Sequence, residues 1–397
     1  MKKVFKWNGL LLLRDWKTRL IILGFLIFLG SFSLLYRQSN VVLPEMQIRE
    51  EYSDSHQIFR MIPASHFEGE LGQEVQQRLG RNSMLIGLNR YILTQQEGNT
   101  VAGLEDVVSD YVNNGREMAV NNLFLHDATE FESYDLLLDV YLPTREEVEQ
   151  QVGFYDALER YDLDFEWNPF SASQVLQQQI ELFVSVVMFI AIALLAGDHF
   201  TKDQVKNYSV TQGLPLSMKT QWRGRTILIW AISWLVALLG IAISYLVSLF
   251  SETTGSLWYP IGVYFNQAVR YIPLWQYGLL LIGLGMLVSY VFILIINGLS
   301  WMIRNIYLTL FVVGGLVLLP MVWTFFTPVT GWQPSFYTDI VSVVSGQSAR
   351  VYQLQTIEFW RLPIIAVVMW VLIELIFHFI FKLIPTQTFG LRRRVTK

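Results

Sequence analysis

Long apolar runs divide this chain into six candidate membrane-spanning helices. Five of the runs carry no charged residue, and the sixth is interrupted only by Glu374 and His378. A helix rises about 1.5 Å per residue, so about 20 residues cross a hydrocarbon core about 30 Å thick. The runs therefore predict a polytopic membrane protein with spans near residues 20–36, 182–197, 226–250, 271–300, 305–326 and 362–381.

A long polar segment, residues 37–175, separates the first two runs and holds 25 acidic residues against nine arginines. Between Glu68 and Gln96 its apolar residues recur at three- and four-residue spacings, which is typical of helices. Thr144 and Glu147 have the spacing of a capping box at a helix start. We expect the Asn-Asn-Gly sequence at 113–115 to separate two helices. The segment thus predicts a mostly helical, acidic domain.

The remaining segments complete an all-α prediction. Residues 1–19 alternate basic and apolar positions, as an amphipathic helix at a membrane surface does. Residues 198–225 predict a short surface helix that ends near Gly213. Residues 327–361 predict short helices that enter the membrane face. The chain is divided into residues 1–36 (surface helix and first span), 37–175 (polar domain) and 176–397 (five spans with the segments 198–225 and 327–361).

Composition and charge give the orientation. Hydrophobic residues make up 53% of the chain, which suits a membrane protein, and there is no cysteine, which excludes disulfides and thiol chemistry. If both termini are cytosolic, the cytosolic segments hold 17 Lys and Arg, including every lysine, against three acidic residues. Positive charge favours the cytosolic side, so we expect both termini inside the cell and residues 37–175 outside it.

No sequence motif predicts nucleotide hydrolysis, metal binding or nucleic-acid binding by this chain. The stretch from Gly213 to Thr220 approaches a phosphate-binding loop, but Met218 replaces the second glycine that such a loop needs for close backbone approach. The acidic segment contains no Asp-x-Asp-x-Asp-Gly loop for Ca²⁺. We therefore expect no catalytic residue, no metal and no cofactor bound by this chain.

Glu374 and His378 are the one ionisable pair inside a predicted span. They lie four residues apart, so they share one helix face. Ionisable groups in a membrane usually face a helix bundle or a water path, which makes the pair a candidate proton or substrate contact. The alternatives are a pair that fastens helices together and a histidine that reaches the cytosolic edge. A zinc protease is disfavoured because the order differs from His-Glu-x-x-His.

Segment 198–225 contains the sequence Leu-Pro-Leu-Ser at 214–217 and the pair Gly224-Arg225 ahead of the third predicted span. With these residues it resembles the cytosolic signature of permease subunits of ABC type-2 exporters. That signature has an acidic residue, Gly-Thr, Leu-Pro-x-Ser and Gly-Lys ahead of the third span. Here Asp203 or Gln204 stands near the acidic position, Leu214 to Ser217 match Leu-Pro-x-Ser, and Gly224-Arg225 stands for Gly-Lys. Lys206-Asn207 departs from Gly-Thr. The six-span layout, with both ends cytosolic, also matches.

The resemblance implies that residues 201–217 form a coupling helix that docks on a separate ATP-binding subunit, which would hold ATP and Mg²⁺. A second permease chain, identical or different, and membrane lipid would be the other partners, and the resemblance implies a bacterial cell membrane. The substrate would be hydrophobic or amphipathic, such as a peptide, a lipid-like compound or a drug. The implied coupling residues are Lys202, Asp203, Gln204, Val205, Asn207, Tyr208, Leu214, Pro215, Leu216 and Ser217.

Two other functions remain open. The first is a membrane sensor that transmits a signal from its outer domain and transports nothing. The second is a membrane enzyme, for which the sequence offers no convincing nucleophile and base.

Overall fold

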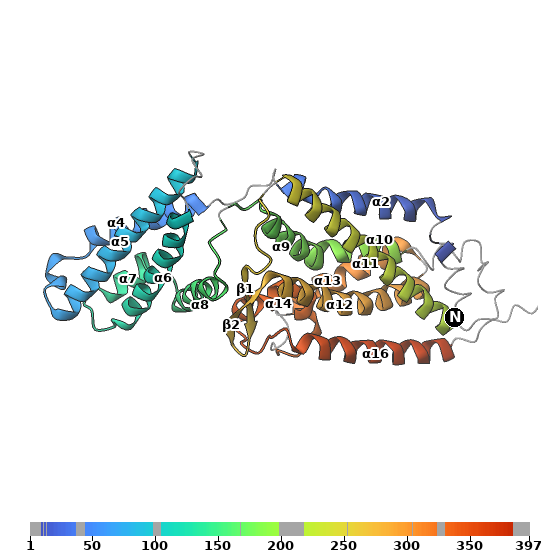
Figure 1. The fold of residues 1–397 in the computed structure, drawn as a ribbon. Helices are drawn as coiled ribbons and strands as arrows, with labels where there is room; N and C mark the ends of the chain where they lie inside the picture. Colours follow the sequence, from blue (N-terminus) through green and yellow to red (C-terminus); the bar gives the residue numbers. More distant parts are fainter. Residues whose placement is uncertain are drawn as a thin grey trace, which may run out of the picture. The chain divides into compact units, whose positions relative to one another are not determined.

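The computed structural model describes residues 9–10, 12, 14–36, 44–97, 105–166, 168–197, 218–251, 253–303, 305–323 and 330–383. The described part is mostly helical and forms two compact units (Figure 1). The first unit comprises Met1–Ser31, Gln179–Ile243 and Leu280–Lys397. The second comprises Phe32–Gln178 and Ser244–Leu279, so it includes residues that the sequence analysis counted with the spans.

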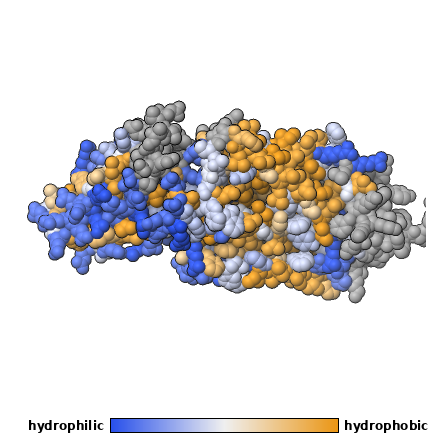
Figure 2. All heavy atoms as spheres, in the orientation of Figure 1, coloured by the Kyte–Doolittle hydropathy of each residue, from blue (hydrophilic) through white to orange (hydrophobic). Residues whose placement is uncertain are grey.

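Four helices among the described residues are long and apolar enough to cross a membrane: Ala172–Ala196, Lys219–Phe250, Leu274–Ile303 and Arg361–Ile380. The first of these is continuous through α9 (Ala172–Leu182), η2 (Phe183–Val187) and α10 (Met188–Ala196). The other three lie in α11 (Met218–Ser251), α12 (Leu274–Ile303) and α16 (Arg361–Leu383). The visible face of the first unit is mostly hydrophobic (Figure 2). These helices support the expected membrane location.

The helices in the expected first and fifth spans are not among these four. The region 20–36 is divided into α2 (Trp16–Gly30), of 15 residues, and α3 (Phe32–Tyr36). At the break, the Ser31 hydroxyl donates to the Ile27 carbonyl at 2.7 Å. The region 305–326 contains α13 (Ile306–Trp323). The total of six spans and the sidedness of the chain therefore stay predictions.

The second unit is built from helices around apolar cores. Its helices are α4 (Pro44–Met61), η1 (Ala64–Phe67), α5 (Glu70–Glu97), α6 (Glu105–Asp127), α7 (Tyr134–Val140) and α8 (Arg145–Tyr161). Val75 and Leu79 of α5 pack with Leu125 and Leu137 in one core. The predicted helix near 68–96 is confirmed, and so is the capping box of Thr144 and Glu147.

The Asn-Asn-Gly sequence does not separate two helices, so that expectation is wrong: residues 113–115 lie inside α6. Asn114 donates to the Asn89 side chain of α5 at 3.0 Å, which gives its amide a partner within the helix pair. A Cβ at Gly115 would overlap the ring of Tyr155 in α8. The glycine therefore permits close packing of α6 and α8, and does not form a turn.

The fold is also not all-α. Strands β1 (Pro260–Phe265) and β2 (Ala268–Pro273) form an antiparallel hairpin in the second unit, and Pro260 pairs with Pro273. The two-residue turn consists of Asn266 and Gln267, with φ angles of 53° and 61°. Two successive positive φ angles are characteristic of the tight turns that join twisted strands. Consequently α12 begins at Leu274, later than the sequence analysis placed the fourth span.

The region 327–361 contains three short helices, as predicted: η4 (Pro334–Thr338), α14 (Ile340–Val344) and α15 (Gln347–Val351). Phe336, Tyr337 and Ile340 are buried within the first unit. Asp339 caps α14, because its carboxylate accepts from the Ser342 amide at 3.2 Å. Whether these three short helices enter a membrane face is not tested, so that expectation stays a prediction.

Replacing Gly115 with alanine tests the close packing of α6 on α8. We expect Gly115→Ala to lower the free energy of unfolding by about 1–3 kcal/mol, because the added methyl group must displace the Tyr155 ring. Gly80→Ala is the matched control, since nothing lies within 4 Å of a Cβ at that exposed position of α5. It should stabilise the helix by about 0.5–1 kcal/mol. Equal stability of both variants in denaturant titration would contradict this packing.

Candidate functional site

The ten residues that the sequence analysis implicated in coupling lie outside the described residues. They are Lys202, Asp203, Gln204, Val205, Asn207, Tyr208, Leu214, Pro215, Leu216 and Ser217. The structure describes the helices on either side of this segment: α10 ends at Ala196 and α11 is described from Met218. The contacts of α10 and α11 therefore show which other helices are linked to the two ends of this segment.

Glu374 forms an ion pair with a residue that the sequence analysis did not connect to it. Its carboxylate accepts two hydrogen bonds from the Arg223 guanidinium, one of them from Nε to Oε1 at 2.9 Å. The Glu374 side chain is 17% exposed and that of Arg223 is 41% exposed. Two parallel bonds between a guanidinium and a carboxylate are the strong form of this interaction. The pair fastens α16 to the first turns of α11.

His378 lies one turn beyond Glu374 and faces Lys219, which lies one turn before Arg223. The Lys219 Nζ atom is 3.5 Å from His378 Nδ1. An ammonium group only donates, so Nδ1 accepts and the ring proton is assigned to Nε2. Glu374 and His378 thus share a helix face, as predicted, but each contacts a basic residue of α11.

These residues line an open groove between α11 and α16, which we call the polar groove. It has a volume of about 320 Å³. It is lined by Lys219, Trp370, Val371, Glu374, Leu375 and His378. No carboxylate among the described residues pairs with Lys219, whereas Glu374 is neutralised by Arg223. The groove therefore combines one unneutralised positive charge with an apolar wall.

Aromatic packing beneath the groove holds three helices together. The ring centroids of Trp222 in α11 and Phe377 in α16 are 5.0 Å apart. A side chain at Gly298 of α12 would collide with the Phe377 ring. Trp222 is 1% exposed. Gly298, which the sequence analysis did not single out, therefore permits the close approach of α12 and α16, as small residues do between membrane helices.

A buried polar layer continues this contact toward the end of α10. Asn297 of α12 donates to the Thr226 hydroxyl of α11 at 3.0 Å. Ser300 of α12 donates to the carbonyl of Gly197, the residue that follows α10, at 3.0 Å. Side-chain hydrogen bonds of this kind hold helices together where water is scarce. The helices at both ends of segment 198–217 are thus bonded to α12.

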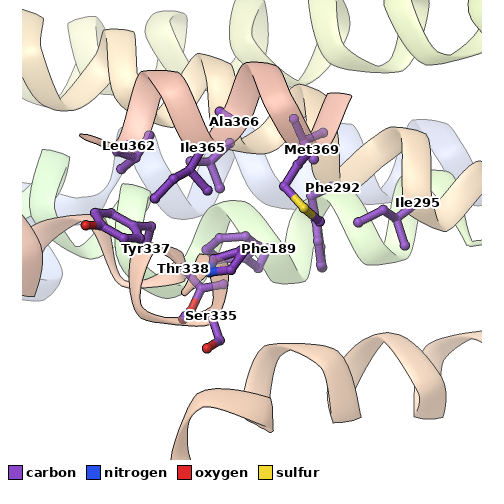
Figure 3. A pocket seen from close by; sticks show the side chains of 13 residues that line it. Phe189, Phe292, Ile295, Ser335, Tyr337, Thr338, Leu362, Ile365, Ala366 and Met369 are labelled. Atoms are coloured by element: carbon purple, nitrogen blue, oxygen red, sulfur yellow. The ribbon is translucent and has the colours of Figure 1, made fainter. Parts of the chain in front are cut away.

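A second cavity in the first unit is almost entirely apolar (Figure 3). It has a volume of about 180 Å³ between α10, α12, η4 and α16. Its lining includes Phe189, Phe292, Ile365 and Met369. Ser335 also lines it, and its buried hydroxyl has no hydrogen-bond partner among the described residues. We call this space the apolar cavity.

Polar groups near this cavity are neutral or paired. Burial raises the pKa of the Tyr337 phenol to about 12, so the group is uncharged at neutral pH. Its hydroxyl donates to the Gly331 carbonyl at 2.6 Å. Arg361, at the start of α16, lies over the rings of Trp332 and Trp360, with its Cζ atom 4.8 and 5.2 Å from their centroids. Such stacking stabilises a cation at a membrane interface.

The described residues contain no group of three or more His, Asp or Glu side chains that could hold a metal ion. Comparisons with protein-family models, with curated proteins and with solved structures find no match to this chain.

Exchanging the charges of Arg223 and Glu374 tests the ion pair. Arg223→Glu or Glu374→Arg alone leaves like charges facing each other, and each should cost about 1–3 kcal/mol. Solvent screens part of this cost because Arg223 is 41% exposed. The double exchange should recover most of the loss in the unfolding midpoint of the solubilised protein. If the stability losses of the two single variants simply add in the double variant, the pairing is contradicted. The control is Arg350→Glu, which changes the charge of an exposed residue in α15.

Proposed function

We propose that this chain is the membrane-spanning permease subunit of an ATP-driven ABC exporter. Its partners would be a separate ATP-binding subunit, which holds ATP and Mg²⁺, and a second permease chain. The chain itself would hydrolyse nothing. Segment 201–217 would dock on the ATP-binding subunit from the cytosol, and the second unit would lie outside the cell membrane of a bacterium.

The observation that carries this proposal is the position of the Leu-Pro-x-Ser sequence. Leu214 to Ser217 directly precede α11, one of the four helices that are apolar and long enough to cross a membrane. Four residues into α11, Trp222 packs against Phe377 of α16. Eight residues into α11, the Thr226 hydroxyl accepts a hydrogen bond from Asn297 of α12. A displacement of the docked segment would therefore be passed to three helices together.

The apolar cavity supports a hydrophobic or amphipathic substrate. An apolar cavity of about 150 Å³ in a protein core stays dry and takes a benzene-sized guest. The cavity here is about 180 Å³, so it accommodates one small apolar group of a larger molecule. Alternating access would require that the substrate bind one state of the bundle more tightly than the other.

A specific contact favours a second candidate function, a sensor that transmits a signal from the second unit. Within that unit, the Tyr271 hydroxyl of β2 donates to the Gln150 carbonyl of α8 at 2.6 Å. Phe154 of α8 also packs against Tyr259 and Tyr271, with ring centroids 5.8 and 5.9 Å apart. The hairpin joins α11 to α12, so a ligand that moved α8 would pull directly on two candidate spans.

Affinity purification of the tagged, gently solubilised chain from its native host tests the proposal. We expect a P-loop ATPase to co-purify with the wild-type chain. The triple variant Tyr208→Ala, Leu214→Ala, Pro215→Ala should lose it, because the docking surface is removed. Tyr91→Ala, which changes an aromatic residue that is 61% exposed on α5, should retain it.

Two other results of that purification would contradict the proposal or part of it. If no ATPase co-purifies and an extracellular protein does, the sensor function replaces the permease. If the ATPase binds the triple variant as well as the wild type, the coupling segment is wrongly placed. ATP-dependent accumulation of a hydrophobic compound in inverted vesicles would then separate an exporter from a sensor that merely binds an ATPase.

A further inference from the structure

We propose that the polar groove between α11 and α16 binds the anionic headgroup of a membrane phospholipid. Lys219 and His378 would hold the phosphate, and an acyl chain would lie along Val371 and Leu375. This inference does not depend on transport, since it rests on the described contacts of the first unit alone.

The groove lies at the depth where lipid headgroups are found. Lys219 is the first residue of one candidate span, and His378 lies two residues before the end of another, which runs to Ile380. The ends of membrane-spanning helices meet the headgroup region of a bilayer. A lysine here keeps its ammonium group among the phosphates while its methylenes contact apolar surface.

The charges in the groove select an anion. Both oxygens of the Glu374 carboxylate accept hydrogen bonds from Arg223, so Glu374 does not neutralise the charge of Lys219. The Lys219 ammonium donates one hydrogen bond toward His378 Nδ1 and retains two further protons. That bond leaves the His378 Nε2 proton available as a second kind of donor. Two donors with one net positive charge match a single phosphodiester.

The apolar wall favours a lipid over a free phosphate ion. Trp370, Val371 and Leu375 line the same groove and are 40%, 50% and 47% exposed. They continue along α16 from the charged end toward the middle of the span. A ligand that satisfied the charged end alone would leave this surface uncovered, whereas a phospholipid covers both parts. Basic pockets between membrane helices bind anionic headgroups by this combination.

Native mass spectrometry of the purified full-length chain in a neutral detergent tests the proposal. The probes are phosphatidylglycerol, phosphatidylcholine and inorganic phosphate. We expect wild-type protein to bind phosphatidylglycerol more tightly than phosphatidylcholine. Lys219→Ala should reduce the affinity for phosphatidylglycerol about fivefold, while Lys219→Arg keeps it. Arg350→Ala, which removes an exposed cation from α15, should change nothing.

Leu375→Ser provides a second variant that leaves the charges in place. It should weaken binding of both lipids, because it removes part of the acyl-chain surface. The proposal is overturned if Lys219→Ala retains the preference for phosphatidylglycerol, or if Arg350→Ala loses it equally. It is also overturned if millimolar inorganic phosphate displaces phosphatidylglycerol as completely as excess lipid does, because the site would then belong to a free anion.

Discussion

The cost of placing backbone polar groups in hydrocarbon constrains the rest of this structure. An apolar segment that crosses a membrane must satisfy every amide and carbonyl within itself, and a helix does so. The four long apolar helices meet this requirement over 20 to 32 residues each. Charged groups are costly away from the ends of such helices, and hydrogen bonds to neighbouring helices stabilise the polar groups between the ends.

The first unit follows that constraint at one end of the bundle. Arg223 and Glu374 neutralise each other, and Asn297, Thr226 and Ser300 are hydrogen-bonded between helices. Gly298 makes room for Phe377, so α12 and α16 approach closely enough for these bonds to form. Charge pairing and close packing occur together here, directly beside the segment that would contact an ATP-binding subunit. These contacts link α10, α11, α12 and α16 at one end of the first unit.

Periodic apolar positions and local capping were sufficient to predict much of the fold. The helix near 68–96 and the start of α8 at Thr144 depend on contacts within a few residues, so the sequence contains their signals. The hairpin was missed because Gln267 occupies a turn position with positive φ where glycine is the usual signal. Gly115 was misread because its partner, Tyr155, lies 40 residues away. Arg223 was likewise not connected to Glu374, since 151 residues separate them.

We propose that segment 198–217 and the second unit lie on opposite sides of a membrane. The chain has no cysteine, so single-cysteine variants report their own accessibility without background. Tyr91→Cys and Gln212→Cys can be labelled with a membrane-impermeant maleimide in intact cells. We expect Tyr91→Cys to be labelled directly and Gln212→Cys to be labelled only after the cells are permeabilised. Labelling of both positions from the same side would contradict it.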